Sequence, residues 1–170
     1  GAVDFYRACK AEGVKPIIGC EVYVTPQGRT RFDKVHELDA ESRHLVLLCE
    51  NEEGYRNLSY LVSMGWTEGF YIKPRIDLEL LRQYSGGLIA LSACLAGEIP
   101  RRLRNGEYEN AKAYALELSH IFGPDRFYLE LQDHGIRDQA IVNQGILRIH
   151  RETGLPMVSV SYTHLTLPTT

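Results

Sequence analysis

The chain lacks the cysteine pairs, long apolar runs and phosphate-binding glycine motifs that mark several common protein classes. Its cysteines are Cys9, Cys20, Cys49 and Cys94, and no two of them form a CxxC pair. This spacing excludes a zinc-finger type of structural site and favours a reduced, cytosolic setting. No segment is long and apolar enough for a membrane span, and we expect no signal peptide. The absence of a GxGxxG motif after a strand and of a Walker A loop disfavours nucleotide-cradling folds.

Charge of either sign is not in large excess. The net charge of −3 does not predict the basic surface that usually accompanies nucleic-acid binding. The 170 residues are 44% hydrophobic and 24% charged, which suits one globular domain with a substantial core. The first residue is not Met, and residues 161–170 carry no charge and are rich in Thr. We therefore expect a chain truncated at both ends, with a domain over residues 1–160 and a tail of foreign sequence over residues 161–170.

Short apolar segments alternate with amphipathic ones along almost the whole chain. Two of the connecting segments, residues 26–42 and 66–77, are predicted to be irregular. The predicted strands are apolar on both faces, which is typical of an α/β domain with a mainly parallel sheet, open or closed into a barrel. The patterns predict strands over 15–24, 44–49, 88–92, 127–131 and from 157, and helices over 3–12, 51–64, 78–83, 99–104, 108–122 and 138–153.

One predicted strand carries a carboxylate in its middle. Glu21 lies between Cys20 and Val22 in a segment that is rich in β-branched residues. Burying a carboxylate costs several kcal/mol unless it has a charged partner or a metal. Glu21 is therefore either a residue on a solvated face, a partner of Lys or Arg, or a metal ligand.

Two further residues near predicted strand ends could complete a metal site with Glu21. His44 begins the second strand, and Cys94 follows the third. If residues 25–43 turn the chain back as a hairpin, His44 approaches Glu21. Imidazole and thiolate favour zinc, while a carboxylate also admits manganese or iron. The alternatives are a hydrogen-bonded structural His and a small buried Cys.

Three other residues are candidates for contacts with phosphate. Lys73 and Arg75 flank Pro74 near two aromatic residues, and such a pair could grip a phosphate group. The alternative is a loop held by surface salt bridges. His134 follows the fourth strand and is either a substrate contact or a turn residue beside a hydrogen-bonding Asp133.

Several segments, taken in order, identify a resemblance to a known family. They are GAVDFY (1–6), KPIIGCEVYV (15–24), RFD (31–33), HLVLL (44–48), NEEGYRNL (51–58), KPRID (73–77), LSACLAGEI (91–99) and YLELQDHGI (128–136). The chain resembles the polymerase-and-histidinol-phosphatase (PHP) domain at the N-terminus of bacterial replicative DNA polymerase III alpha subunits. The resemblance covers residues 1–160. It implies a distorted βα barrel of the PHP type, incomplete here at its N-terminus.

The resemblance also implies a cluster of divalent metal ions, zinc or manganese, at the barrel mouth. Glu21, His44 and Cys94 fall on three of the family's ligand positions. His164 is in register with a fourth, but its neighbours differ, and Tyr162 stands where the family has an Asp ligand. In some members of the family this cluster supports 3′–5′ exonuclease proofreading.

The parent protein implied by the resemblance is a cytoplasmic DNA-directed DNA polymerase that acts in DNA replication. Its polymerase domain, which needs Mg²⁺, is absent from this chain. Its expected partners are DNA and other replicase subunits, including a proofreading exonuclease or a sliding clamp, and no membrane. Two alternatives remain open. One is a non-catalytic PHP domain that braces the polymerase or docks a proofreading subunit, and the other is a free-standing PHP phosphoesterase.

We expect the 170-residue chain alone to be inactive as a nuclease. The family's opening His-x-His and Thr-Asp-His ligands would lie upstream of Gly1, so about half of the ligand set is missing. Incubation with a single-stranded DNA oligonucleotide and manganese, followed by gel analysis, measures this directly. Robust manganese-dependent turnover would contradict the expectation.

Overall fold

The computed structural model describes residues 1–160, which form two compact units. The first unit comprises Gly1–Ala90, and the second begins at Leu91. The position of His164 and the expected tail over residues 161–170 lie outside the described residues. Each unit is a mixture of helices and strands, so the predicted α/β class is confirmed. The barrel of the PHP type stays a prediction.

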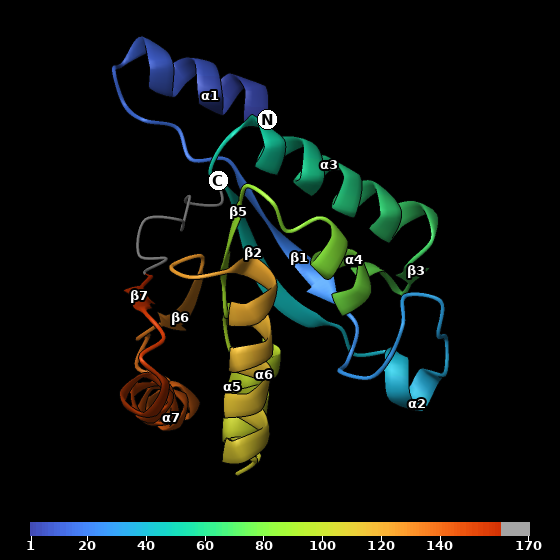
Figure 1. Cartoon of the computed structure of the whole chain (residues 1–170), viewed down its shortest axis with the longest axis vertical. Helices are drawn as coiled ribbons and strands as arrows, with labels where there is room; N and C mark the ends of the chain where they lie inside the picture. The colour runs from blue at the N-terminus through green and yellow to red at the C-terminus, as the bar shows by residue number, and fades with distance from the viewer. Residues whose placement is uncertain (161–170) are drawn as a thin grey trace, which may run out of the picture. The chain divides into compact units, whose positions relative to one another are not determined.

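The first unit is built on a mixed sheet (Figure 1). Its strand order is β3-β4-β1-β2-β5. β1 pairs with β2 in antiparallel fashion and with β4 in parallel fashion. The prediction of a mainly parallel sheet is therefore wrong here, because residues 25–42 return the chain directly alongside β1. The elements are α1 (Ala2–Ala11), β1 (Gly19–Val24), α2 (His36–Asp39), β2 (Arg43–Cys49), α3 (Glu52–Thr67), β3 (Phe70–Tyr71), β4 (Lys73–Ile76), α4 (Leu78–Gln83) and most of β5 (Leu88–Leu91).

The two faces of the β1–β2 pair differ in character. Successive side chains of a strand point to opposite faces, so Val22 and Val24 share one face with Leu45 and Leu47. These four side chains are buried, and α3 contacts β1, β2 and β4. The alternation leaves the residues between them on the other face, where the candidate ligands of this unit lie.

The second unit packs two long helices, α6 and α7, against a parallel pair of strands. β6 is parallel to β7, and α6 and α7 both contact β6. α5 contacts α6 and α7 (Figure 1). Within residues 1–160, no helix combines the length and the apolar character that crossing a bilayer requires. The elements are α5 (Glu98–Arg104), α6 (Tyr108–Phe122), β6 (Phe127–Leu131), α7 (Arg137–Thr153) and β7 (Met157–Ser159).

Local sequence signals fixed several element ends correctly. The Asn51 side chain accepts a hydrogen bond from the amide of Gly54 at 3.0 Å and so caps α3. Asp77 caps α4 in the same way, accepting from the amide of Leu80 at 3.0 Å. α7 ends at Gly154, whose φ of +74° favours a residue without a Cβ.

Three predicted boundaries are wrong. Residues 66–77 contain β3 and β4, which have only two and four residues and are too short to show a strand alternation. The region 26–42 contains the one-turn helix α2. The predicted strand 15–24 begins only at Gly19, because the paired ladder with β2 starts there.

The Arg75 side chain is an internal brace, not a phosphate contact. It is 0% exposed, and its Nε donates to the carbonyl oxygen of Gly69 at 3.1 Å. Its terminal nitrogens donate to the carbonyl oxygens of Asp39, Arg31 and Asp33 at 3.3, 3.2 and 2.8 Å. Burial lowers the pKa of this guanidinium, but an arginine remains charged at neutral pH. The prediction that Arg75 binds phosphate is therefore wrong, because its hydrogen-bonding nitrogens are occupied inside the fold.

A second buried charge, Asp39, lies in the same loop region. Arg29 donates to its two carboxylate oxygens at 2.8 and 2.6 Å, and the amide of Val35 donates at 2.7 Å. The hydrogen bonds from Arg29 hold the pKa of Asp39 well below its ordinary value, at about 2. Residues 29–39 are thus a loop ordered by buried charges, although their sequence is polar.

Replacing the guanidinium of Arg75 should destabilise the chain strongly. We expect Arg75→Met to lower the free energy of unfolding by about 3–5 kcal/mol, because four carbonyl oxygens, all buried or partly buried, lose their donor. Urea denaturation followed by circular dichroism measures the loss. The matched control is Arg56→Met, since Arg56 and its partner Glu52 are 76% and 77% exposed. This control should cost less than about 1 kcal/mol. Equal losses in the two variants would contradict the assigned role.

The stabilisation from Asp39 should disappear in acid. A carboxyl group whose pKa falls on folding stabilises the fold above its unfolded pKa, about 3.9, and loses that contribution as the pH falls through its folded pKa. With a folded pKa of about 2, the loss should occur between roughly pH 4 and pH 2. We expect the stability difference between the parent chain and Asp39→Asn to shrink across this window in urea titrations. A difference that does not depend on pH would contradict this assignment.

Candidate metal centre

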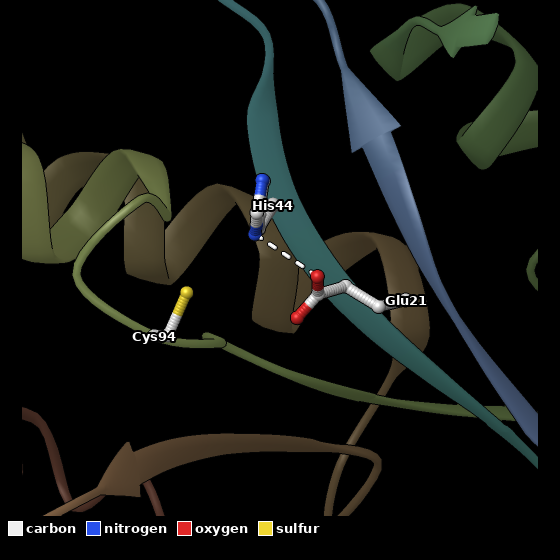
Figure 2. A group of neighbouring side chains, drawn as sticks. All are labelled: Glu21, His44 and Cys94. Atoms are coloured by element: carbon white, nitrogen blue, oxygen red, sulfur yellow. Dashed lines mark ion pairs between the residues drawn. The ribbon is translucent and has the colours of Figure 1, made fainter. Parts of the chain in front are cut away.

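The antiparallel hairpin brings Glu21 and His44 together. In the ladder, Glu21 is opposite Val46 and Tyr23 is opposite His44, so Glu21 and His44 form a diagonal pair on one face. The His44 Nδ1 lies 3.0 Å from the Glu21 Oε1. Figure 2 shows the two side chains pointing toward each other from neighbouring strands. The predicted approach of His44 to Glu21 is confirmed.

The pair lies on the more open face of the sheet. The Glu21 side chain is 38% exposed and the His44 side chain is 20% exposed. The premise of a strand buried on both faces is therefore wrong, because Val22 and Val24 are buried on one face, whereas Glu21 on the other face is exposed. Desolvation does not force Glu21 to find a partner. Its carboxylate and the imidazole are instead accessible to an incoming ion or ligand.

Tyr23 and Lys73 flank the pair on the same unit. The rings of Tyr23 and His44 are 5.1 Å apart at an interplanar angle of 71°, an edge-to-face contact. The Lys73 Nζ lies 4.4 Å from the centroid of the Tyr23 ring. The sequence alone does not predict a role for Tyr23. The available signal was its spacing of two residues from Glu21, which places both on one face of a strand.

Cys94 belongs to the second unit and follows β5 in a tight turn. Ala93, the residue before Cys94, has a φ of +64°, a left-handed backbone conformation that costs an L-residue about 1–2 kcal/mol. The amide of Gly97 donates to the Cys94 carbonyl oxygen at 2.8 Å. A Cβ on Gly97 would lie 2.4 Å from the carbonyl oxygen of Ser92, so the turn requires glycine there. Strained backbone of this kind is common where a fold presents a functional side chain.

A buried acid, Glu130, lies in the same unit as Cys94. Both residues line a small cavity of about 10 Å³. The Glu130 side chain accepts a hydrogen bond from Gln132, and the Glu130 amide donates to the Ser92 Oγ at 2.8 Å. Sequence reasoning missed Glu130 as a candidate. It carries the signal that had marked Glu21, an acid in the middle of an apolar strand.

His134 occupies a turn after β6. Its amide donates to the Gln139 Oε1 at 2.8 Å, and the Asp133 carboxylate accepts from the amide of Gly135 at 3.1 Å. Gly135 has a φ of +71°, which fits a turn position. These bonds order the backbone and leave a contact between the imidazole and phosphate as a prediction.

The cysteines on β1 and β2 are less suited to hold a metal. Cys20 and Cys49 are free, and burial raises the pKa of both thiols. A metal ligand is a thiolate, so a raised pKa opposes ligation. Within this pair of strands, the carboxylate of Glu21 and the imidazole of His44 are therefore the better donors.

The sequence matches a family model described as "PHP domain" over residues 1–134. It is 46% identical over 164 residues to the DNA polymerase III subunit alpha of Borreliella burgdorferi, and 46% identical over 164 residues to that of Thermus aquaticus. It is 50% identical over 142 residues to that of Chlamydia muridarum. These alignments cover 96%, 96% and 83% of this chain, but only 14%, 13% and 11% of the relatives. The chain thus spans about one seventh of the length of the first of these curated relatives.

Proposed function

Because this chain belongs to the PHP domain family, we propose that it carries a metal-dependent phosphoesterase site within the alpha subunit of a bacterial replicative DNA polymerase. The observation that carries this proposal is the pairing of Glu21 with His44 at 3.0 Å on an accessible face. The names of its relatives favour the polymerase over a free-standing phosphoesterase. The finer proposal is the removal of nucleotides from a DNA 3′ end.

The proposed ligands of the metal are Glu21, His44 and Cys94. They offer a carboxylate oxygen, an imidazole nitrogen and a thiolate sulfur. This donor set fits zinc, and its carboxylate and imidazole also suit manganese. Divalent ions held there would polarise a phosphodiester and supply a nucleophile at neutral pH.

The chain's own cations would hold the substrate. Lys73 is exposed and lies over Tyr23, next to the Glu21–His44 pair, so its ammonium group is available to a phosphate oxygen. We propose the same role for His134 in the second unit, which is exposed in its turn. Arg75 has no such role, because its guanidinium is buried.

The activity of the whole protein is part of the proposal. The relatives are named as DNA polymerase III subunit alpha, which supports DNA-directed DNA polymerisation by a longer protein. We propose that this longer protein acts in the cytoplasm and that its polymerase domain uses Mg²⁺. DNA and other replicase subunits, such as a proofreading exonuclease or a sliding clamp, are the proposed partners. The PHP site would act beside polymerisation, on the ends of strands that the polymerase has made.

Metal titration of the 170-residue chain tests the proposed ligands. We expect Zn²⁺ to bind in competition with a chromophoric chelator, and Co²⁺ to give a thiolate charge-transfer band. Glu21→Gln, His44→Gln and Cys94→Ser should each lower the affinity at least about tenfold, since each removes a donor. Cys94→Ser should also abolish the charge-transfer band.

The matched controls are Cys9→Ser and His36→Gln, which change the same residue types on α1 and α2. Both should bind metal like the parent chain. Equal metal affinity in all five variants would overturn the metal site and would favour a PHP domain that only braces the polymerase.

A further inference from the structure

Tyr23 occupies the central position of the open face of the first unit. β1 lies between β2 and β4, and the ladder places Tyr23 directly opposite His44 on one side and Arg75 on the other. Glu21, two residues earlier, shares this face. No other residue of β1 is in register with both a candidate metal ligand, His44, and the buried Arg75.

The ring of Tyr23 contacts two functional groups at once. Its edge-to-face contact with His44 has a centroid distance of 5.1 Å, and the Lys73 Nζ lies 4.4 Å from its centroid. Such aromatic contacts and cation–π contacts restrict a side chain that would otherwise rotate. The imidazole of His44 is thus held by a carboxylate at Nδ1 and by a ring at its side.

The backbone before Lys73 adds a second observation. Ile72 joins β3 to β4 with a φ of +63°, an outlier for a β-branched residue. Tyr71 and Lys73 are paired across this connection. A strained connection of this kind persists only where its surroundings determine it, and here it fixes the residue that carries the ammonium group.

We propose that Tyr23 is a positioning residue of the site, acting through His44 and Lys73. Its ring sets the orientation of the imidazole and keeps the ammonium group on the same face, where a DNA phosphate would arrive. Tyr23 itself touches neither metal nor substrate. This inference rests on the proposed function, because it assigns His44 to a metal and Lys73 to a phosphate.

The first test compares Tyr23→Leu, which removes the ring, with Tyr23→Phe, which keeps it. In NMR spectra of the metal-free chain, the ring protons of His44, assigned with His44→Gln, should show a ring-current displacement in the parent and in Tyr23→Phe. Tyr23→Leu should abolish this displacement and lower the affinity for Zn²⁺ about three- to tenfold. Tyr23→Phe should retain the affinity of the parent, which separates the ring from the hydroxyl group.

The second test concerns the ammonium group and uses a short single-stranded DNA oligonucleotide as the probe. Lys73→Met should lower DNA affinity about two- to fivefold and leave Zn²⁺ affinity unchanged. Tyr23→Leu should lower both affinities. If Tyr23 were merely structural, we would not expect Lys73→Met to lower DNA affinity alone while Tyr23→Leu lowers both DNA and Zn²⁺ affinity.

The outcomes separate the two proposals. If His44→Gln binds Zn²⁺ like the parent, the metal site fails, while the ring-current and DNA measurements still judge Tyr23. If His44→Gln loses affinity but Tyr23→Leu does not, the positioning role fails and the metal site stands. Should Tyr23→Leu not fold, the absence of a ring-current displacement at His44 in the parent chain would overturn the inference, as would unchanged DNA affinity in Lys73→Met.

Discussion

The buried guanidinium of Arg75 is the constraint on which the first unit depends. A charge without solvent is stable only when hydrogen bonds replace those to water, and here four of them go to backbone carbonyls from two separate loop regions. Three of those carbonyls belong to residues 31–39, which connect β1 to β2. Arg75 therefore orders the connection that returns the chain, and the returning strand carries His44. The geometry of the candidate site is set by a residue that lies outside it.

Neighbouring charges extend this constraint to the helices. The Arg31 amide and guanidinium donate to the Asp77 carboxylate at 3.0 and 3.1 Å, and the same carboxylate caps α4. Arg31 also donates to Glu68 just beyond α3 at 2.6 Å. One loop residue thus connects the ends of two helices. The polar composition of residues 26–42, which suggests a solvated loop, instead supplies interior hydrogen bonds.

The sequence carried enough information for elements whose signals are local. These elements depend only on residues within a turn or two of one another. They are the caps Asn51 and Asp77, the left-handed Gly154 and the periodic helix over residues 108–122. β3 and β4 could not be predicted in this way, since β3 is a strand only through its pairing with β4, and β4 also pairs with β1. The site divides along the same line. The pairing of Glu21 with His44 followed from a hairpin, whereas the contact of Tyr23 with Lys73 and the hydrogen bond of Glu130 with Ser92 join segments that are distant in sequence.

The register of the β1–β2 ladder also limits how this protein can vary. Glu21 and His44 share a face because Tyr23 is aligned with His44, and the side-chain period of a strand is two. A slip of one residue would turn the imidazole toward α3 and bring Leu45 to the open face. Homologues can therefore gain or lose residues between the two strands only where the ladder keeps this alignment. Any such change must also preserve the carbonyl groups of the connection that accept hydrogen bonds from Arg75.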